Sequence, residues 1–261
     1  MSEQQLSLDL PIKQDASLSD FTSPSWASII DVVRQLHAGL LQQLYFYGEP
    51  DTGKTHLLSA ICESFRDSGQ SVIYLSLREL IHADPSVLSA LESMQVIAVD
   101  DIDSIQGSHQ WQEAIFHLIN LSNEYNNVLI FAGRLPVSQL DFSLKDLLSR
   151  LAKSPTFQLP SGRDRLDRAM ILQSVLKRRN WHFDSRITEH LLNQGPHRVG
   201  AMLAVMNELQ PVFSNLERVH VTKAKIQEAI RIIDDQTLAY ELKDLDSELD
   251  DIQSTDDFLN F

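Results

Sequence analysis

The sequence predicts an α/β fold, in which a parallel sheet with helices on both faces is followed by a smaller, all-helical part. Short, continuous apolar runs alternate with amphipathic helical patterns as far as residue 160, which is typical of a parallel sheet covered on both faces. After Pro160 the patterns are helical, and a glycine-containing segment at 48–55 separates the first strand from its helix. These observations together predict the fold class.

The predicted elements follow in order along the chain. Apolar runs predict strands at Leu44–Tyr47, Val72–Leu75, Val96–Val99, Val128–Phe131 and Phe157–Leu159. Helical spacing predicts helices at Ser25–Leu41, from His56 onward, and at Trp111–Asn123, Arg163–Asn180, Ser185–Asn193, Pro196–Gln210 and Thr222–Ile233. Pro196 suits the first position of its helix, because that position has no N–H to lose.

The composition is that of a soluble globular protein. With 261 residues, 43% of them hydrophobic, the chain can bury one α/β domain and a smaller one. It lacks the run of about 20 apolar residues that a membrane span needs, and a secretory signal is not expected at its N-terminus. Cys62 is the only cysteine and is expected to be a buried, small apolar residue. We therefore expect a cytoplasmic protein without membrane contacts.

The negative charge is concentrated at the C-terminal end. The formal net charge is −14, and residues 234–261 carry −9 of it. Nothing in the sequence provides a broad basic face, so direct, strong binding to duplex DNA is not expected. The acidic tail 234–261 is expected to be disordered, because its charges repel one another and its leucines are isolated.

The segment at 48–55 satisfies the phosphate-loop pattern G-x-x-x-x-G-K-[ST] and lies where that motif must lie, between a strand and a helix. Glycines let successive N–H groups and the helix N-terminus face a polyphosphate, which Lys54 also reaches. The alternative is an ordinary glycine-containing turn. The candidate nucleotide-binding residues are Gly48, Glu49, Pro50, Asp51, Thr52, Gly53, Lys54, Thr55 and His56.

An acidic pair ends the third predicted strand. Asp100 and Asp101 follow Val96–Val99, and a parallel strand delivers its C-terminal residues to the sheet edge where ligands bind. In P-loop nucleoside triphosphatases the first carboxylate of such a pair helps to hold Mg²⁺ and the second orients the attacking water. Asp100 and the Thr55 hydroxyl are therefore predicted to hold Mg²⁺, and Asp101 to orient a water molecule. The alternative is an acidic exit from a strand.

The order of these motifs resembles the AAA+ ATPases of the DnaA branch, and within it the regulatory proteins of Hda type. The resemblance runs from about residue 5 to 233 and includes Gln5–Leu10, Trp111–Phe116, Arg134–Leu140 and Leu147–Leu151. It implies a flexible arm at 1–20, a P-loop AAA+ domain with a parallel sheet at 21–160 and a C-terminal helical lid at 161–233. DnaA itself carries a basic DNA-binding domain after the lid, where this chain has the acidic tail.

The N-terminal arm is similar to the peptide with which Hda-type proteins bind the sliding clamp of DNA polymerase III. In an extended peptide Leu6, Leu8 and Leu10 lie on one side and can fill an apolar groove, while Gln5 forms a hydrogen bond at its edge. Asp9 stands where the family often has proline. The alternatives are a first strand or an arm without a partner.

The resemblance also implies that Arg150 is an arginine finger, offered to a nucleotide on a neighbouring subunit or on DnaA. An arginine so placed stabilises the charge that develops on a transferred phosphoryl group. The alternative is a surface arginine that pairs with Asp146, four residues earlier on the same helix.

Two positions depart from the family's pattern. Arg134 stands where the family carries an acidic or amide residue beside the γ-phosphate, and Gly200 stands where the lid arginine is usual. Arg198 would lie about 200° away from position 200 on a helix and is therefore expected to face away. We expect ADP or ATP to bind with Mg²⁺, and intrinsic hydrolysis to be weak.

The resulting functional hypothesis is a negative regulator of chromosomal replication initiation. It would dock on the clamp, meet the AAA+ domain of DnaA and promote hydrolysis of the ATP that DnaA holds, and it could also self-associate. One alternative is a helicase loader of the DnaC or IstB kind, which predicts a basic surface for single strands that the charge balance does not favour. Another is a diverged clamp-bound adaptor with a different partner.

Overall fold

The computed structural model describes residues 15–89, 91, 93–210 and 222–232. The peptide Gln5–Leu10, which is predicted to bind a clamp, and the acidic tail 234–261 therefore lie outside the described residues. Helices (α), 3₁₀ helices (η) and strands (β) follow in the order η1 Leu18–Asp20, η2 Pro24–Trp26, α1 Ala27–His37, β1 Gln43–Tyr47, α2 Lys54–Asp67, β2 Val72–Ser76, α3 Leu77–Leu80, η3 Pro85–Leu88, β3 Val96–Asp100, η4 Ile102–Ile105, α4 His109–Tyr125, β4 Val128–Gly133, η5 Val137–Gln139, α5 Lys145–Leu151, β5 Thr156–Gln158, α6 Arg165–Arg178, α7 Ser185–Gln194 and α8 Val199–Glu208.

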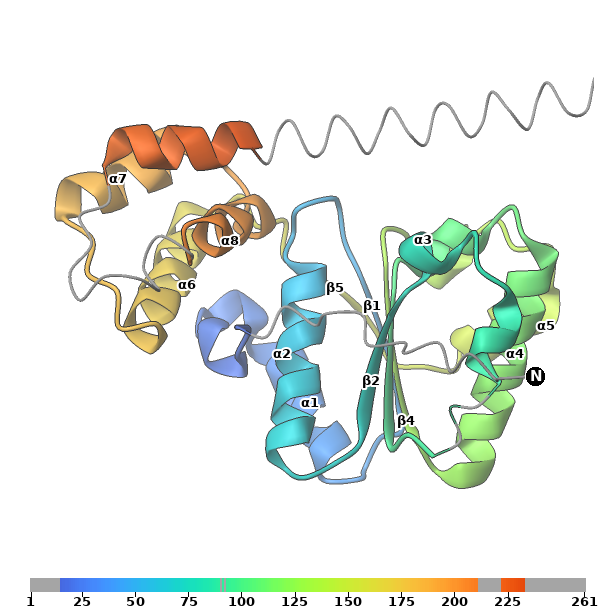
Figure 1. The fold of residues 1–261 in the computed structure, drawn as a ribbon. Helices are drawn as coiled ribbons and strands as arrows, with labels where there is room; N and C mark the ends of the chain where they lie inside the picture. The colour runs from blue at the N-terminus through green and yellow to red at the C-terminus, as the bar shows by residue number, and fades with distance from the viewer. Residues whose placement is uncertain (1–14, 90, 92, 211–221, 233–261) are drawn as a thin grey trace, which may run out of the picture. The chain divides into compact units, whose positions relative to one another are not determined.

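The five predicted strands are confirmed and form one parallel sheet in the order β2-β3-β4-β1-β5. The register pairs Tyr47 with Gly133 and Ser76 with Asp100, so the carboxyl ends of four strands lie level. In Figure 1 this edge is the upper one, where the chain leaves β1 and turns into α2. The sheet therefore brings the phosphate loop and the acidic pair to one edge.

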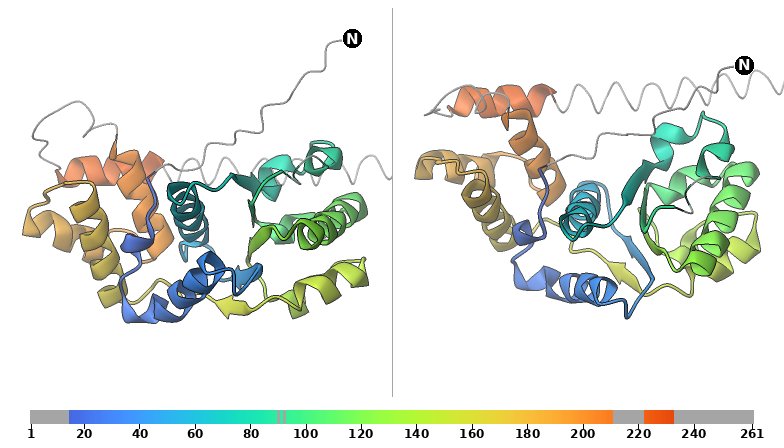
Figure 2. Two further views of the ribbon diagram at one scale, coloured as in Figure 1. Left: turned by 90° about the horizontal axis from the view of Figure 1, so that it is seen from below. Right: turned by 60° about the horizontal axis from the view of Figure 1, so that its bottom comes forward.

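Helices cover both faces of the sheet, as the apolar strands require. Figures 1 and 2 show α1 and α2 on one face, and α4 and α5 on the other. Because side chains alternate along a strand, Tyr45 packs into the core beside α4 while its buried neighbours Leu44 and Phe46 point to the opposite face. No helix in the described part of the chain is long and apolar enough to cross a membrane.

A buried ionic network joins the start of the described chain to the helix that follows the phosphate loop. The Asp20 carboxylate is fully buried; His56 Nε2 lies 2.9 Å from it and Arg178 donates to both of its oxygens. Burial would raise the pKa of Asp20, but hydrogen bonds from His56 and Arg178 outweigh burial and lower it. Asp15 also pairs with Arg178. Residues 15–20, placed in the predicted arm, thus take part in the fold.

The described residues divide into two compact units. The first runs to Trp181 and includes Arg198–Ala201, and the second contains 182–197 and the described residues from 202 onward. The second unit is helical, as predicted, and buries Leu191, Met206 and Ile226. The lid boundary at residue 161 stays a prediction. The predicted helix start at Pro196 is wrong, because α8 begins at Val199.

Candidate nucleotide-binding site

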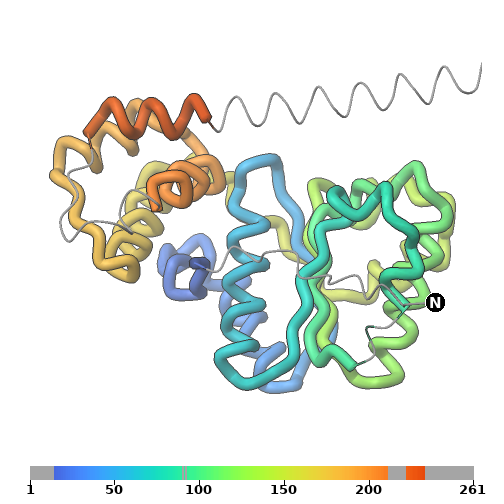
Figure 3. The backbone as a smooth tube through the Cα atoms, in the orientation of Figure 1, coloured from blue at the N-terminus to red at the C-terminus, as the bar shows by residue number. Residues whose placement is uncertain are grey.

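The loop between β1 and α2 has the backbone geometry of an anion cradle. Gly53 adopts φ +95°, a left-handed conformation that glycine tolerates best, and stands as the N-cap of α2 without a capping side chain. The N–H groups of the first turn of this 14-residue helix are thus available to an anion. Figure 3 traces this path from β1 through the loop into α2. A Cβ on Gly48 would lie 2.9 Å from Thr52 Oγ1, so the loop closes tightly at its start.

Lys54 is the cation of this cradle. Its side chain is nearly buried, and Nζ donates to the carbonyl oxygens of Gly48 and Glu49 at 2.9 and 2.8 Å. Burial lowers the pKa of Lys54, while the charges of Asp100 and Asp101 oppose this shift. A desolvated ammonium held at the loop is placed to form strong, charge-assisted contacts with a phosphate.

Asp100 and Thr55, which the sequence assigned to Mg²⁺, are brought together by the structure. Thr55 Oγ1 donates to Asp100 Oδ2 at 2.7 Å, and the hydroxyl of Tyr74 donates to the same oxygen at 2.9 Å. The other oxygen of Asp100 accepts the N–H of Asp101. A hydroxyl and a carboxylate side by side suit Mg²⁺, which takes one or two protein oxygens and completes its shell with water and phosphate oxygens. The donor set therefore fits a magnesium–nucleotide complex.

Asp101 lies beside this pair in a strained and electrostatically unfavourable position. It adopts φ +53°, and Arg78 Nη2 lies 3.4 Å from its Oδ1. Burial and the negative charge of Asp100 raise the pKa of Asp101 to about 6. Strain and a shifted pKa in one residue at a ligand-binding sheet edge are typical of a functional position.

Arg134 follows β4 at the same sheet edge and is paired with an aspartate that the sequence analysis missed. The N–H of Arg134 donates to Asp103 Oδ1 at 2.7 Å, and its Nε lies 3.7 Å from Asp103 Oδ2. Tyr74 and Arg78 were missed as well. The pairing of Ser76 with Asp100 places the end of β2, and with it Tyr74 and Arg78, beside the acidic pair. This pairing could not be found from the sequence, because it depends on the register of the two strands.

Arg198 holds the outside of the phosphate loop, so the expectation that it faces away is wrong. Its Nη1 donates to the carbonyl of Pro50 at 2.8 Å and its Nη2 to the Glu49 carboxylate at 2.7 Å. Arg163 donates to the same carboxylate, and these contacts lower the pKa of Glu49. The helical argument fails because residue 198 precedes α8 and does not follow its periodicity.

Gly200, which the resemblance sets at the position of the lid arginine, leaves no room for a side chain on this backbone. Its N–H donates to the carbonyl of Asp51 at 2.7 Å, and a Cβ at this position would also lie 2.7 Å from that oxygen. Any side chain at 200 would therefore force residue 200 away from the backbone of Asp51.

The remaining predicted site residues have contacts of other kinds. Thr52 Oγ1 donates within the loop to Glu49, whereas His56 is buried and its Nε2 is engaged by Asp20. Arg150 lies on α5, half-buried, with its guanidinium 5.8 Å from the centre of the Phe116 ring of α4. The alternative, an ion pair between Arg150 and Asp146, is not among the ion pairs of the described residues. The structure thus assembles the loop, Lys54, Thr55 and the acidic pair, but not Arg150.

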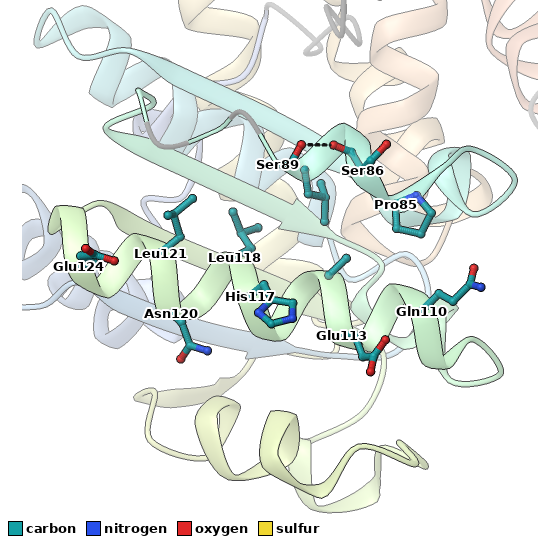
Figure 4. A pocket seen from close by; sticks show the side chains of 12 residues that line it. Pro85, Ser86, Ser89, Gln110, Glu113, His117, Leu118, Asn120, Leu121 and Glu124 are labelled. Carbon is teal, nitrogen blue, oxygen red and sulfur yellow. Dashed lines mark hydrogen bonds between the residues drawn. The ribbon is translucent and has the colours of Figure 1, made fainter.

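A separate groove of about 600 Å³ runs between η3 and α4. Figure 4 shows Leu118 and Leu121 of α4 facing Ser86 and Ser89 across it, with His117 and Glu113 along the helix. The residues that line it belong to neither the phosphate loop nor the acidic pair. The groove is therefore distinct from the candidate nucleotide site.

Replacing Asp101 by asparagine is expected to stabilise the protein at alkaline pH. The folded-state pKa of Asp101, about 6, exceeds its ordinary value of 3.8, so ionisation of this carboxyl at pH 8 opposes folding. Asp101→Asn should raise the free energy of unfolding at pH 8 by on the order of 1–3 kcal/mol. The gain should shrink below pH 6 and vanish near pH 4, where Asp101 is protonated.

Urea unfolding at pH 8, 6 and 4.5 measures the change in the free energy of unfolding. The control is Asp31→Asn, a change at an exposed residue that is expected to have little effect. A loss of stability in Asp101→Asn at pH 8 would contradict the assignment of an unfavourable charge to this position.

The comparisons with known proteins agree with this geometry. Residues 27–154 match the family model of the bacterial DnaA ATPase domain. A crystal structure of domain III of the replication initiation protein DnaA from Thermotoga maritima has a TM-score of 0.67 and 17% identity, over 86% of this chain and 98% of that one. DnaA from Aquifex aeolicus bound to AMPPCP has a TM-score of 0.60 and 23% identity, over 75% of this chain and 65% of that one.

A further solved structure shares the fold at lower identity. It is a single-residue variant of Thermotoga maritima RuvB, with a TM-score of 0.54 and 14% identity, over 85% of this chain and 73% of that one. The chain spans just under two thirds of the Aquifex aeolicus protein. The described residues thus have the α/β fold of DnaA-type AAA+ domains, and residues 27–154 carry the sequence pattern of the DnaA ATPase domain.

Proposed function

We propose that this protein is an Hda-like regulator of replication initiation, which binds ADP or ATP with Mg²⁺ and acts on the ATP held by DnaA. The observation that carries the proposal is the assembled site on a DnaA-type fold: a phosphate loop with Lys54 buried in it, and Thr55 bonded to Asp100. Binding is expected because cation, helix N-terminus and magnesium ligands are all in place.

Intrinsic hydrolysis is expected to be weak, because two charges differ from those of the family. Arg134 replaces an acidic or amide residue, and Gly200 leaves the lid without its usual arginine. Asp101 remains as a group that can orient water. The bound nucleotide would then serve mainly to hold the AAA+ domain and the lid in a form that meets a partner.

Arg150 would be the residue that this protein supplies to the nucleotide site of its partner. It lies near the end of α5, is half-buried, and has its guanidinium over the Phe116 ring of α4. An arginine supplied from a neighbouring subunit stabilises the charge on the transferred phosphoryl group. The partners of this scheme are the sliding clamp, bound through the arm, and DnaA, bound through the AAA+ domain.

Arg150→Ala is expected to abolish the stimulation of ATP hydrolysis on DnaA. Because a supplied arginine contributes about 10³-fold or more to such reactions, we expect stimulation to fall by at least about 100-fold. The measurement is the decay of labelled ATP on DnaA in the presence of clamp-loaded DNA and the variant. Lys153→Ala removes an exposed positive charge close by and serves as the control. Full stimulation by Arg150→Ala would rule out the finger role.

Clamp binding is expected to require the N-terminal arm. Replacing Gln5 and Leu6 by alanine removes an edge hydrogen bond and an anchor, which at a small peptide interface weakens binding by about 2 kcal/mol or more, or about 30-fold. Ser7→Ala with Asp9→Ala changes the intervening positions of the same peptide and is expected to leave the affinity nearly unchanged. Fluorescence anisotropy with purified clamp measures both. If the Gln5 and Leu6 variant binds as well as the unmodified chain, the docking proposal fails.

A further inference from the structure

Three consecutive residues of the phosphate loop accept hydrogen bonds from Arg198 and Gly200. Arg198 donates from Nη2 to the Glu49 carboxylate at 2.7 Å and from Nη1 to the Pro50 carbonyl at 2.8 Å. The N–H of Gly200 donates to the carbonyl of Asp51, also at 2.7 Å. The donors and the acceptors belong to the same compact unit. The first half of the loop is therefore held residue by residue.

These contacts support a strained backbone at Asp51. This residue adopts φ +59°, in the left-handed region, which costs free energy for a residue with a Cβ. Such a conformation persists where the surrounding contacts determine it. Arg198 binds the carbonyl of the peptide group before Asp51, and Gly200 binds the carbonyl of the peptide group after it. The two donors thus fix both peptide groups whose orientation defines the strained residue.

The Glu49 carboxylate gives the guanidinium of Arg198 its second acceptor. Arg163 donates to the same carboxylate at 3.2 Å, so one carboxylate joins two arginines. The Arg198 side chain is 23% exposed, against 56% for Glu49. Exposed ion pairs contribute little to stability, but a planar guanidinium with two fixed acceptors has a defined direction. The network is therefore better suited to orienting the loop than to stabilising the fold.

The same part of the loop also holds the cation of the site. The backbone carbonyl of Glu49 accepts Lys54 Nζ at 2.8 Å and the hydroxyl of Thr52 at 3.0 Å. At the far end of the loop, a Cβ on Gly53 would lie 3.3 Å from Cγ1 of Val199, the residue between the two donors. A displacement of the loop at Glu49 would thus also displace Lys54.

We propose that Glu49 and Arg198 are positioning residues of the nucleotide site, which hold loop residues 49–51 in the phosphate-binding conformation before a nucleotide arrives. The proposal rests on nucleotide binding as proposed above. Glu49 acts through Arg198, and Arg198 acts through the Pro50 carbonyl, without a contact of either side chain with the nucleotide. The affinity then depends on the fraction of molecules whose loop is in the binding conformation.

The sign of the effect of Glu49 separates positioning from charge. A carboxylate at the loop repels a polyphosphate, so its removal would strengthen binding if charge decided the affinity. If positioning decides the affinity, removal of the same carboxylate releases Arg198 and weakens binding. The two explanations therefore predict opposite changes in one variant.

The test is calorimetric titration of the full chain with ADP and Mg²⁺. Glu49→Ala removes the carboxylate but keeps the backbone carbonyl that accepts Lys54. It should raise the dissociation constant by about fivefold, as expected for a loop that is in the binding conformation about a fifth of the time. Glu49→Gln keeps an oxygen that Arg198 can bind and should give an intermediate constant. Arg198→Gln should weaken binding by about the same factor as Glu49→Ala.

The double variant, Glu49→Ala with Arg198→Gln, distinguishes a shared contact from summed charges. If the two residues act through one contact, the double variant should bind about as weakly as Arg198→Gln alone. If only charge mattered, the two changes would offset each other and the double variant would bind like the unmodified chain.

Two controls accompany the titrations. Lys177→Gln removes an exposed positive charge of α6 and should leave the dissociation constant unchanged. Thermal unfolding without nucleotide should change little in Glu49→Ala, because the ion pairs of Glu49 are exposed. A merely structural role of Glu49 would do the reverse: it would lower the Tm and leave the dissociation constant unchanged.

A dissociation constant for Glu49→Ala within about twofold of the unmodified value, or below it, would overturn the proposal while leaving nucleotide binding intact. A double variant that binds like the unmodified chain would overturn it as well. If the unmodified chain does not bind ADP, the proposed function itself fails and the proposal with it. The two failures are therefore distinguishable in one titration series.

Discussion

The pairing of β1 with β4 is the constraint on which the rest of the site depends. Tyr47 pairs with Gly133, and the N–H of the next residue, Gly48, donates to the Gly133 carbonyl. The loop therefore begins at a fixed position along β4. On its other side β4 pairs with β3, which delivers Asp100 to the same edge, where Thr55 donates to it. A slip of one residue in either pairing would move these side chains to the opposite faces of their strands.

This edge combines features that favour binding with features that oppose stability. Lys54 is desolvated, Asp101 is strained and carries a raised pKa, and three carboxylates lie close to one another. Such an arrangement is unfavourable in the isolated fold, and a bound cation would relieve the repulsion among the carboxylates. The outside of the loop is held differently, by Arg198, Arg163 and the N–H of Gly200. The segment 198–200 thus contacts carbonyl groups and a carboxylate of the loop and not its N–H groups.

The sequence was sufficient for the parts of the site that depend on local pattern. The phosphate loop, the strands and the placement of Asp100 beside Thr55 follow from a contiguous motif and from the rule that parallel strands end at one edge. The contacts of Tyr74, Arg78 and Asp103 were missed, because they depend on register and on the turn after β3. Arg198 was misplaced because the helix begins only at Val199, two residues after His197, so Arg198 lies outside it. A helical projection cannot place a residue until the first residue of the helix is known.

The central claim is that the edge formed by β1, β3 and β4 binds a nucleoside polyphosphate through Lys54. Calorimetric titration with ADP and Mg²⁺ tests it most directly, comparing the unmodified chain with Lys54→Ala and with Lys145→Ala, which removes an exposed lysine of α5. Loss of a charge-assisted contact of about 1.5–3 kcal/mol predicts a dissociation constant at least about tenfold higher in Lys54→Ala and an unchanged one in the control. Equal affinity in all three proteins would contradict the account, because the phosphates would then be bound elsewhere or not at all.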